Sequence, residues 1–155
     1  MFNRLKKRKQ LLIEFENMSS FLFDCMFRCI IYDLDEDDYM HEIDNIASCV
    51  IHAKVLSEER FCYRSNPYET NRYLFKGFPE TVYESRIICL SKLRNFGRAY
   101  LHLTNEQFLY FCNCYKSLSS FIENYLSTDF KVEDNLLKEK IISVIDTYRC
   151  KDSFI

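Results

Sequence analysis

The sequence predicts an all-α protein, folded as an irregular bundle of six to eight helices in a single helical domain, residues 1–155. The chain of 155 residues contains only two glycines and two prolines, whereas average usage would supply about ten and eight. All-β sandwiches and barrels need frequent turn residues, so this composition excludes them. Apolar residues make up 48% of the chain, which is enough to bury a full core, and they recur at helical spacing.

The N-terminal third is expected to contain two helices. A short amphipathic helix is predicted over residues 4–16, where apolar positions alternate with charges. A second helix is predicted over 19–32, because Ser19 and Ser20 form a suitable N-cap before an almost wholly apolar stretch. A helix that is apolar all round belongs in the centre of a core.

The next part of the chain alternates between polar and regular segments. The acidic stretch 33–42 is expected to be a loop or a short helical turn, followed by a helix over 43–59 with apolar residues at three-four spacing. Pro67 and Pro79 then punctuate residues 60–80, and each proline disfavours helix just before it. We therefore expect 60–80 to be an irregular connection.

The C-terminal half carries the clearest helix signals. A helix over 80–99 is expected to end near Gly97, a natural C-cap. Thr104 and Gln107 fit a capping box and predict the start of the next helix. A last helix is expected over 132–148. The apolar stripe that follows the capping box repeats at intervals of three and four and consists of Phe108, Phe111, Tyr115, Leu118, Ile122 and Tyr125.

Charge excludes a general nucleic-acid binder. Lys and Arg number 21 against 23 Asp and Glu, a formal net charge of −2. The exception is the basic N-terminal segment 1–10, which a phosphate-rich surface would attract. No stretch approaches the about 20 apolar residues of a membrane span, and no signal-peptide apolar region follows the basic segment. A cytoplasmic protein without a membrane span is expected.

Eight cysteines raise the questions of disulfides, metal and catalysis. Without a secretory signal, reduced and mostly buried thiols are expected. Cys112 and Cys114 would lie about 200° apart on a helix, and Cys25 and Cys29 share a face but lack a second pair, so no metal site is predicted. The sequence contains neither a glycine-rich phosphate loop nor a glycine-flanked serine elbow. We therefore predict no catalytic residues and no enzyme.

Residues 93–108, which read LRNFGRAYLHLTNEQF, resemble the globin family, in which a Leu-Gly-Arg-x-His segment ends one helix and a Thr-Pro-Glu-x-Phe start opens the next. Residues 125–133 are similar to the joint between the last two globin helices, and Tyr148 also fits. Residues 51–56, IHAKVL, are similar to the segment that carries the distal histidine. The similarity is good over about 60 residues and faint in the first half of the chain.

This resemblance implies a pocket for haem or another small apolar ligand between 43–59 and 93–108. His52 would line its distal side, and Tyr100 or His102 its proximal side. The family's proximal ligand position falls on Tyr100 here, and tyrosine is known to ligate ferric haem. His102, two residues later, would point about 200° away if the helix continued. The implied function is a globin-like, non-catalytic binding or sensing domain.

A second resemblance leads to a different function. Residues 94–98, RNFGR, are similar to the Asn-Trp-Gly-Arg signature of the Bcl-type apoptosis regulators, which include divergent viral members. It implies a host-modulating interaction module with a protein partner: Arg98 would pair with an acidic residue on the partner's amphipathic helix, and Phe96, Phe108 and Phe111 would line the groove. The chain departs from the family in having no tryptophan. The simplest alternative makes these phenylalanines ordinary core residues.

Overall fold

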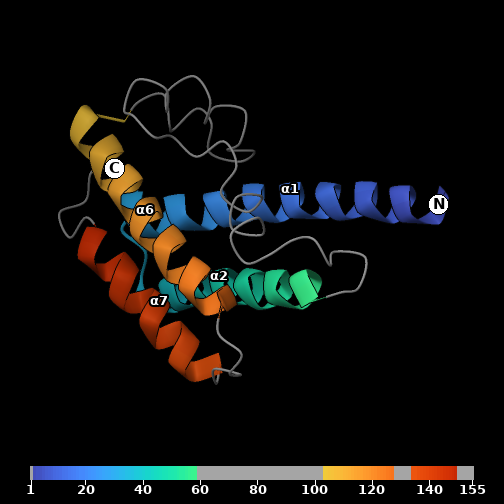
Figure 1. The fold of residues 1–155 in the computed structure, drawn as a ribbon. Coiled ribbons are helices and arrows are strands. Elements are labelled where there is room, and N and C mark those ends of the chain that lie inside the picture. Colours follow the sequence, from blue (N-terminus) through green and yellow to red (C-terminus); the bar gives the residue numbers. More distant parts are fainter. Residues whose placement is uncertain (1, 59–102, 128–133, 150–155) are drawn as a thin grey trace.

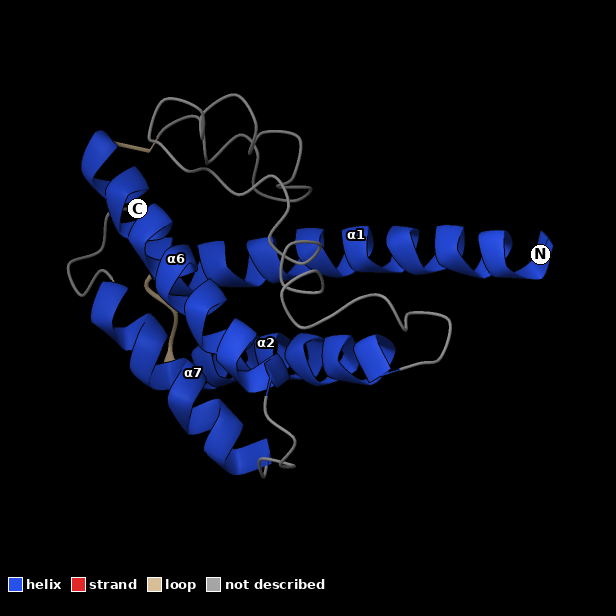
Figure 2. Cartoon of the chain, viewed as in Figure 1, coloured by secondary structure: helices blue, strands red, loops and turns tan. Residues whose placement is uncertain are grey.

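The computed structural model describes residues 2–58, 103–127 and 134–149 of the chain (Figure 1). These residues form four helices, with no strand among them (Figure 2). The all-α prediction is therefore confirmed. The described part of the chain contains four helices rather than the predicted six to eight. The helix predicted over 80–99 and the irregular connection predicted over 60–80 lie outside the described residues. The four helices are α1 (Phe2–Ile31), α2 (Glu36–Glu58), α6 (Asn105–Ser127) and α7 (Asp134–Tyr148).

The first difference in helix number arises in α1. The two helices predicted over 4–16 and 19–32 form one continuous helix of 30 residues. Ser19 and Ser20 do not cap a helix N-terminus, because both lie within α1 and are buried, at 0% and 5% exposure. The helix continues because the spacing of buried apolar residues is unbroken across the serines, as shown by Leu11, Phe15, Met18 and Leu22.

The start of α2 lies inside the acidic stretch that was predicted as a loop or short turn. Only residues 32–35 are non-helical, and α2 begins at Glu36. The backbone N–H of Asp38 donates a hydrogen bond of 2.8 Å to Oδ1 of Asp35, which makes Asp35 the N-cap. Three acidic residues occupy the first turn of α2, where the positive end of the helix dipole stabilises them.

The start of α6 agrees with the sequence. The backbone N–H of Thr104 donates to Oε1 of Gln107 at 2.8 Å, and that of Gln107 donates to Oγ1 of Thr104 at 3.2 Å. These two bonds form the predicted capping box. All six residues of the predicted apolar stripe on α6 are buried. The final helix, predicted over 132–148, is also present and is described from Asp134 onward.

The four helices share one core. α1 and α2 run side by side in opposite directions, and both α6 and α7 pack against α1 (Figure 1). α7 also packs against α2 and α6. The N-terminal part of α1 extends past the end of α2 (Figure 1), and Leu11 is the first buried side chain on α1 among those described. The core therefore forms around the later two thirds of α1.

Candidate functional site

His52, the expected distal haem residue, lies on an exposed part of α2. Its Nε2 is 2.7 Å from Oε1 of Glu14 on α1, and the two side chains are 49% and 46% exposed. This contact joins the surfaces of α1 and α2. The two proximal candidates, Tyr100 and His102, lie outside the described residues. Within the described part of the chain, His52 thus has a carboxylate as its hydrogen-bond partner.

Phe108 and Phe111, two of the expected groove-lining residues, lie in the core. Their exposed fractions are 1% and 0%. The ring centroid of Phe111 is 5.0 Å from that of Phe23 and 5.9 Å from that of Phe27, both on α1. Rings at these separations are in direct contact, so aromatic side chains fill the space between α1 and α6 at this level. Phe96 and Arg98 lie outside the described residues.

The neighbouring side chains of α6 face outward. Leu109 is 51% exposed and Tyr110 is 38% exposed, although both sit between the two core phenylalanines in sequence. Lys116 is also exposed, and it follows Leu109 by seven residues, which places the two within about 20° on a helix. A surface of two apolar side chains and one cation results. The sequence could have indicated this surface, because residues 108–111 are four consecutive apolar residues, FLYF. An α-helix cannot direct four consecutive side chains into one core.

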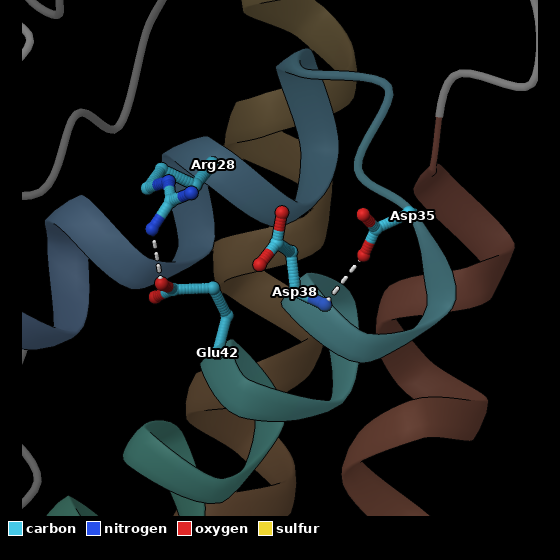
Figure 3. A network of polar contacts seen from close by, with 4 residues as sticks. All are labelled: Arg28, Asp35, Asp38 and Glu42. Atoms are coloured by element: carbon cyan, nitrogen blue, oxygen red, sulfur yellow. Dashed lines mark hydrogen bonds and ion pairs between the residues drawn. The ribbon is translucent and has the colours of Figure 1, made fainter.

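A partly buried ion pair connects α1 with the start of α2 (Figure 3). Nη1 of Arg28 is 2.5 Å from Oε1 of Glu42, and the two side chains are 34% and 5% exposed. Burial, together with a hydrogen bond to Glu42, raises the pKa of the Cys25 thiol well above its ordinary value. Glu42 thus accepts hydrogen bonds from two groups on α1. The pairing was not predicted, because nothing in the local sequence links positions 28 and 42.

A second polar cluster fixes the end of α7 to the start of α2. The hydroxyl of Tyr39 donates a 2.7 Å hydrogen bond to Oδ1 of Asp146. The guanidinium of Arg149 lies 4.0 Å from the centroid of the Tyr39 ring and donates to the carbonyl of Leu34 at 2.8 Å. Burial and the Asp146 carboxylate raise the pKa of the Tyr39 hydroxyl far above its ordinary value. The cluster is well suited to hold helices together.

The cysteines of the described helices are buried, as predicted, and no disulfide joins them: Cys25, Cys29, Cys49, Cys112 and Cys114. Burial raises the pKa of Cys49 to about 11 and, with a smaller contribution from Glu42, that of Cys29 to about 12. Burial also raises the pKa of Cys114 well above its ordinary range. Thiols with such pKa values stay protonated near neutral pH and are poor nucleophiles.

No group of three or more His, Cys, Asp or Glu side chains with metal-binding geometry exists within the described residues. Cys62, Cys89 and Cys150 belong to the rest of the chain. The described cysteines therefore act as small apolar residues of the core.

The N-terminal half of α1 presents a cationic and apolar surface. Lys6 and Lys9 are exposed, and Leu12 and Ile13 are 37% and 57% exposed. None of the helices in the described part of the chain is long and apolar enough to cross a membrane.

The comparisons with known proteins identify no relative. No protein-family model matches the chain, and no curated protein or solved structure matches it.

Proposed function

We propose that this protein is a helical interaction module that binds an amphipathic helix of a partner protein. The observation that carries the proposal is the outward-facing pair Leu109 and Tyr110 on α6, with the exposed Lys116 on the same side of the helix as Leu109. An amphipathic helix docks through apolar anchors spaced three or four residues apart. An acidic residue beside those anchors would complement Lys116.

The position of this surface along the chain agrees with the Bcl-type resemblance. Residues 94–98 lie shortly before α6, and Arg98 is the residue expected to pair with the partner's acid. The contact surface differs from the resemblance in one respect: Leu109 and Tyr110 take the place of Phe108 and Phe111. Both phenylalanines are buried in the core, and Phe111 packs against Phe23 of α1.

A peptide titration tests this proposal. Labelled amphipathic helical peptides that carry an acidic residue are titrated with the full chain, and fluorescence anisotropy is measured. We expect Leu109→Glu and Arg98→Ala each to weaken binding at least about tenfold, equivalent to about 1.4 kcal/mol. Leu136→Glu is the matched control, because Leu136 is 44% exposed on α7, away from this surface.

Two outcomes would contradict the proposal. One is the absence of binding by any peptide at micromolar concentration. The other is equal binding by Leu109→Glu and Leu136→Glu, which would mean that the exposed face of α6 has no special role. Far-UV circular dichroism of each variant checks that the helices are retained.

A globin-like domain that binds or senses haem is the second proposal. Its support is the start of α6 at Asn105, within the capping box formed by Thr104 and Gln107. The globin resemblance implies that a long helix starts at this position. The full chain is mixed with haemin and its absorption spectrum is recorded. A Soret band that shifts on binding and is lost in Tyr100→Phe or His102→Ala supports the proposal. Failure of any shift in the wild-type protein removes it.

A further inference from the structure

The exposed face of the N-terminal half of α1 combines positive charge with apolar surface. On a helix with about 100° per residue, Lys6, Lys9 and Ile13 fall within an arc of about 60°. Leu11, which packs into the core at 7% exposure, lies about 160° away from Ile13. The two lysines and the isoleucine therefore point away from the bundle, where nothing in the described part of the chain covers them.

The charge of this region is concentrated. Five of the six residues over 4–9 are Lys or Arg, and all of them belong to α1. The nearest acidic side chains on α1 are Glu14, which is bonded to His52, and Glu16, which is exposed. Two exposed lysines, Lys6 and Lys9, and the exposed Ile13 that follows them therefore lie on the part of α1 that extends past α2 (Figure 1).

We propose that this face of α1 docks onto an anionic lipid surface, with the helix lying in the plane of the interface. Helices that bind membranes in this way carry Lys and Arg beside large apolar side chains that enter the headgroup region. Anionic headgroups attract each nearby cation, and Ile13 and Leu12 supply the apolar contact. This surface and its partner are separate from those of the proposed helix-binding function.

Lipid fits this face better than nucleic acid does. Duplex and single-stranded nucleic acids are bound through cations together with hydrogen-bond donors or stacking aromatic rings. The exposed side chains around the two lysines include Ile13 and Leu12, at 57% and 37% exposure, which would gain nothing from a phosphate backbone. A lipid interface uses both the cations and these aliphatic side chains.

Vesicle sedimentation with the full chain tests the inference. Vesicles of phosphatidylcholine alone are compared with vesicles enriched in phosphatidylserine, and only the second kind should bind the protein. The double variant Lys6→Glu and Lys9→Glu should weaken binding by roughly thirtyfold or more, from the typical attraction per cation. Ile13→Asn should weaken it as well, and Glu16→Lys should strengthen it by roughly fivefold.

Matched controls separate this face from general charge effects. Lys140→Glu and Leu136→Glu change an exposed cation and an exposed leucine of α7, and both should bind vesicles as the wild type does. Raising the salt from about 0.1 M to about 1 M, which shortens the screening length from about 10 Å to about 3 Å, should release most of the protein.

Several results would overturn the inference. Equal binding to both kinds of vesicle, or no binding to either, would do so. Loss of binding in the double lysine variant without any effect of Ile13→Asn, together with equal affinity for an RNA duplex, would make the face an electrostatic nucleic-acid site instead. The gain expected for Glu16→Lys keeps the test informative even if a loss-of-function variant unfolds, and its absence would contradict the proposed orientation.

Discussion

Replacing the buried Phe111 by alanine should destabilise the fold far more than replacing an exposed residue of the same helix. Phe111 is 0% exposed, and its ring contacts those of Phe23 and Phe27, with centroids at 5.0 and 5.9 Å. The truncation removes both aromatic contacts and leaves a cavity between α6 and α1. Fully buried Phe→Ala changes cost about 3–5 kcal/mol, and two aromatic contacts favour the upper half of that range.

The expected loss is large relative to the whole stability of the chain, which is about 5–15 kcal/mol for a domain. It corresponds to a decrease in Tm of about 8–20 °C for a protein of this size. The assay is urea unfolding followed by far-UV circular dichroism, in which the midpoint should fall while the slope stays constant. Phe111→Leu, which keeps most of the apolar volume, should fall between the wild type and Phe111→Ala.

Leu109→Ala is the matched control, because Leu109 is two residues away on α6 and 51% exposed. Its free energy of unfolding should change by no more than about 0.5 kcal/mol. If Phe111→Ala lowered the free energy of unfolding as little as Leu109→Ala, Phe111 would not be packed between α6 and α1 as described above. Phe111 would then be accessible to a partner, as the Bcl-type resemblance originally implied.

Three further perturbations test other parts of the structure by urea unfolding. Asp35→Ala should cost about 1 kcal/mol because it removes the N-cap of α2, and an effect no larger than that of an exposed Asp→Ala change elsewhere would refute that role. Arg28→Met should lower the free energy of unfolding by about 2 kcal/mol. This is less than the about 3–5 kcal/mol for breaking a fully buried ion pair, because Arg28 is 34% exposed. The double variant Arg28→Met and Glu42→Gln should regain part of that stability, since it no longer leaves the Glu42 carboxylate without its cation. Burial raises the pKa of Cys49 from 9.0 to about 11, so its contribution to stability should be complete below pH 9.0 and lost as the pH rises toward 11. Cys49→Ala should reduce that pH dependence, and an unchanged dependence would argue against the burial.

The start of α6 could be predicted because its signals are local. The capping box needs only residues 104 and 107, and the stripe that follows depends only on spacing along one helix. Both were predicted and both are present. The start of α2 was also readable in principle. Asp35 followed by three acidic residues is an N-terminal signature, but an acidic run is equally typical of a solvated loop, and the prediction left a loop and a short helical turn open.

The continuity of α1 required more than local preference. Serine pairs favour N-caps, and this preference predicted a break at Ser19 and Ser20. In the structure both serines are buried within the helix, and the stripe of buried apolar residues continues on both sides of them, at Phe15, Met18 and Leu22. The net gain from that packing exceeds the about 1 kcal/mol that an N-cap typically supplies.

The contacts of the candidate site were not predicted, because they join distant positions. Tyr39 meets Asp146 across 107 positions, and His52 meets Glu14 across 38. A single sequence lists the groups that could pair but not which of them meet. The two resemblances implied a pocket beside His52 and a groove beside Phe108 and Phe111; the structure places His52 in a surface contact with Glu14 and the two phenylalanines in the core.

By itself the sequence determined the helical class, the capping box of α6 and the apolar stripe that follows this capping box. These properties follow from composition and from the spacing of residues along one helix, so they are set within a few turns of chain. Only the tertiary structure decided that Leu109 and Tyr110 face outward while Phe108 and Phe111 are buried in the core, and that the start of α1 extends past α2. The physical reason is that burial depends on which helices pack together, and this is a property of the whole core.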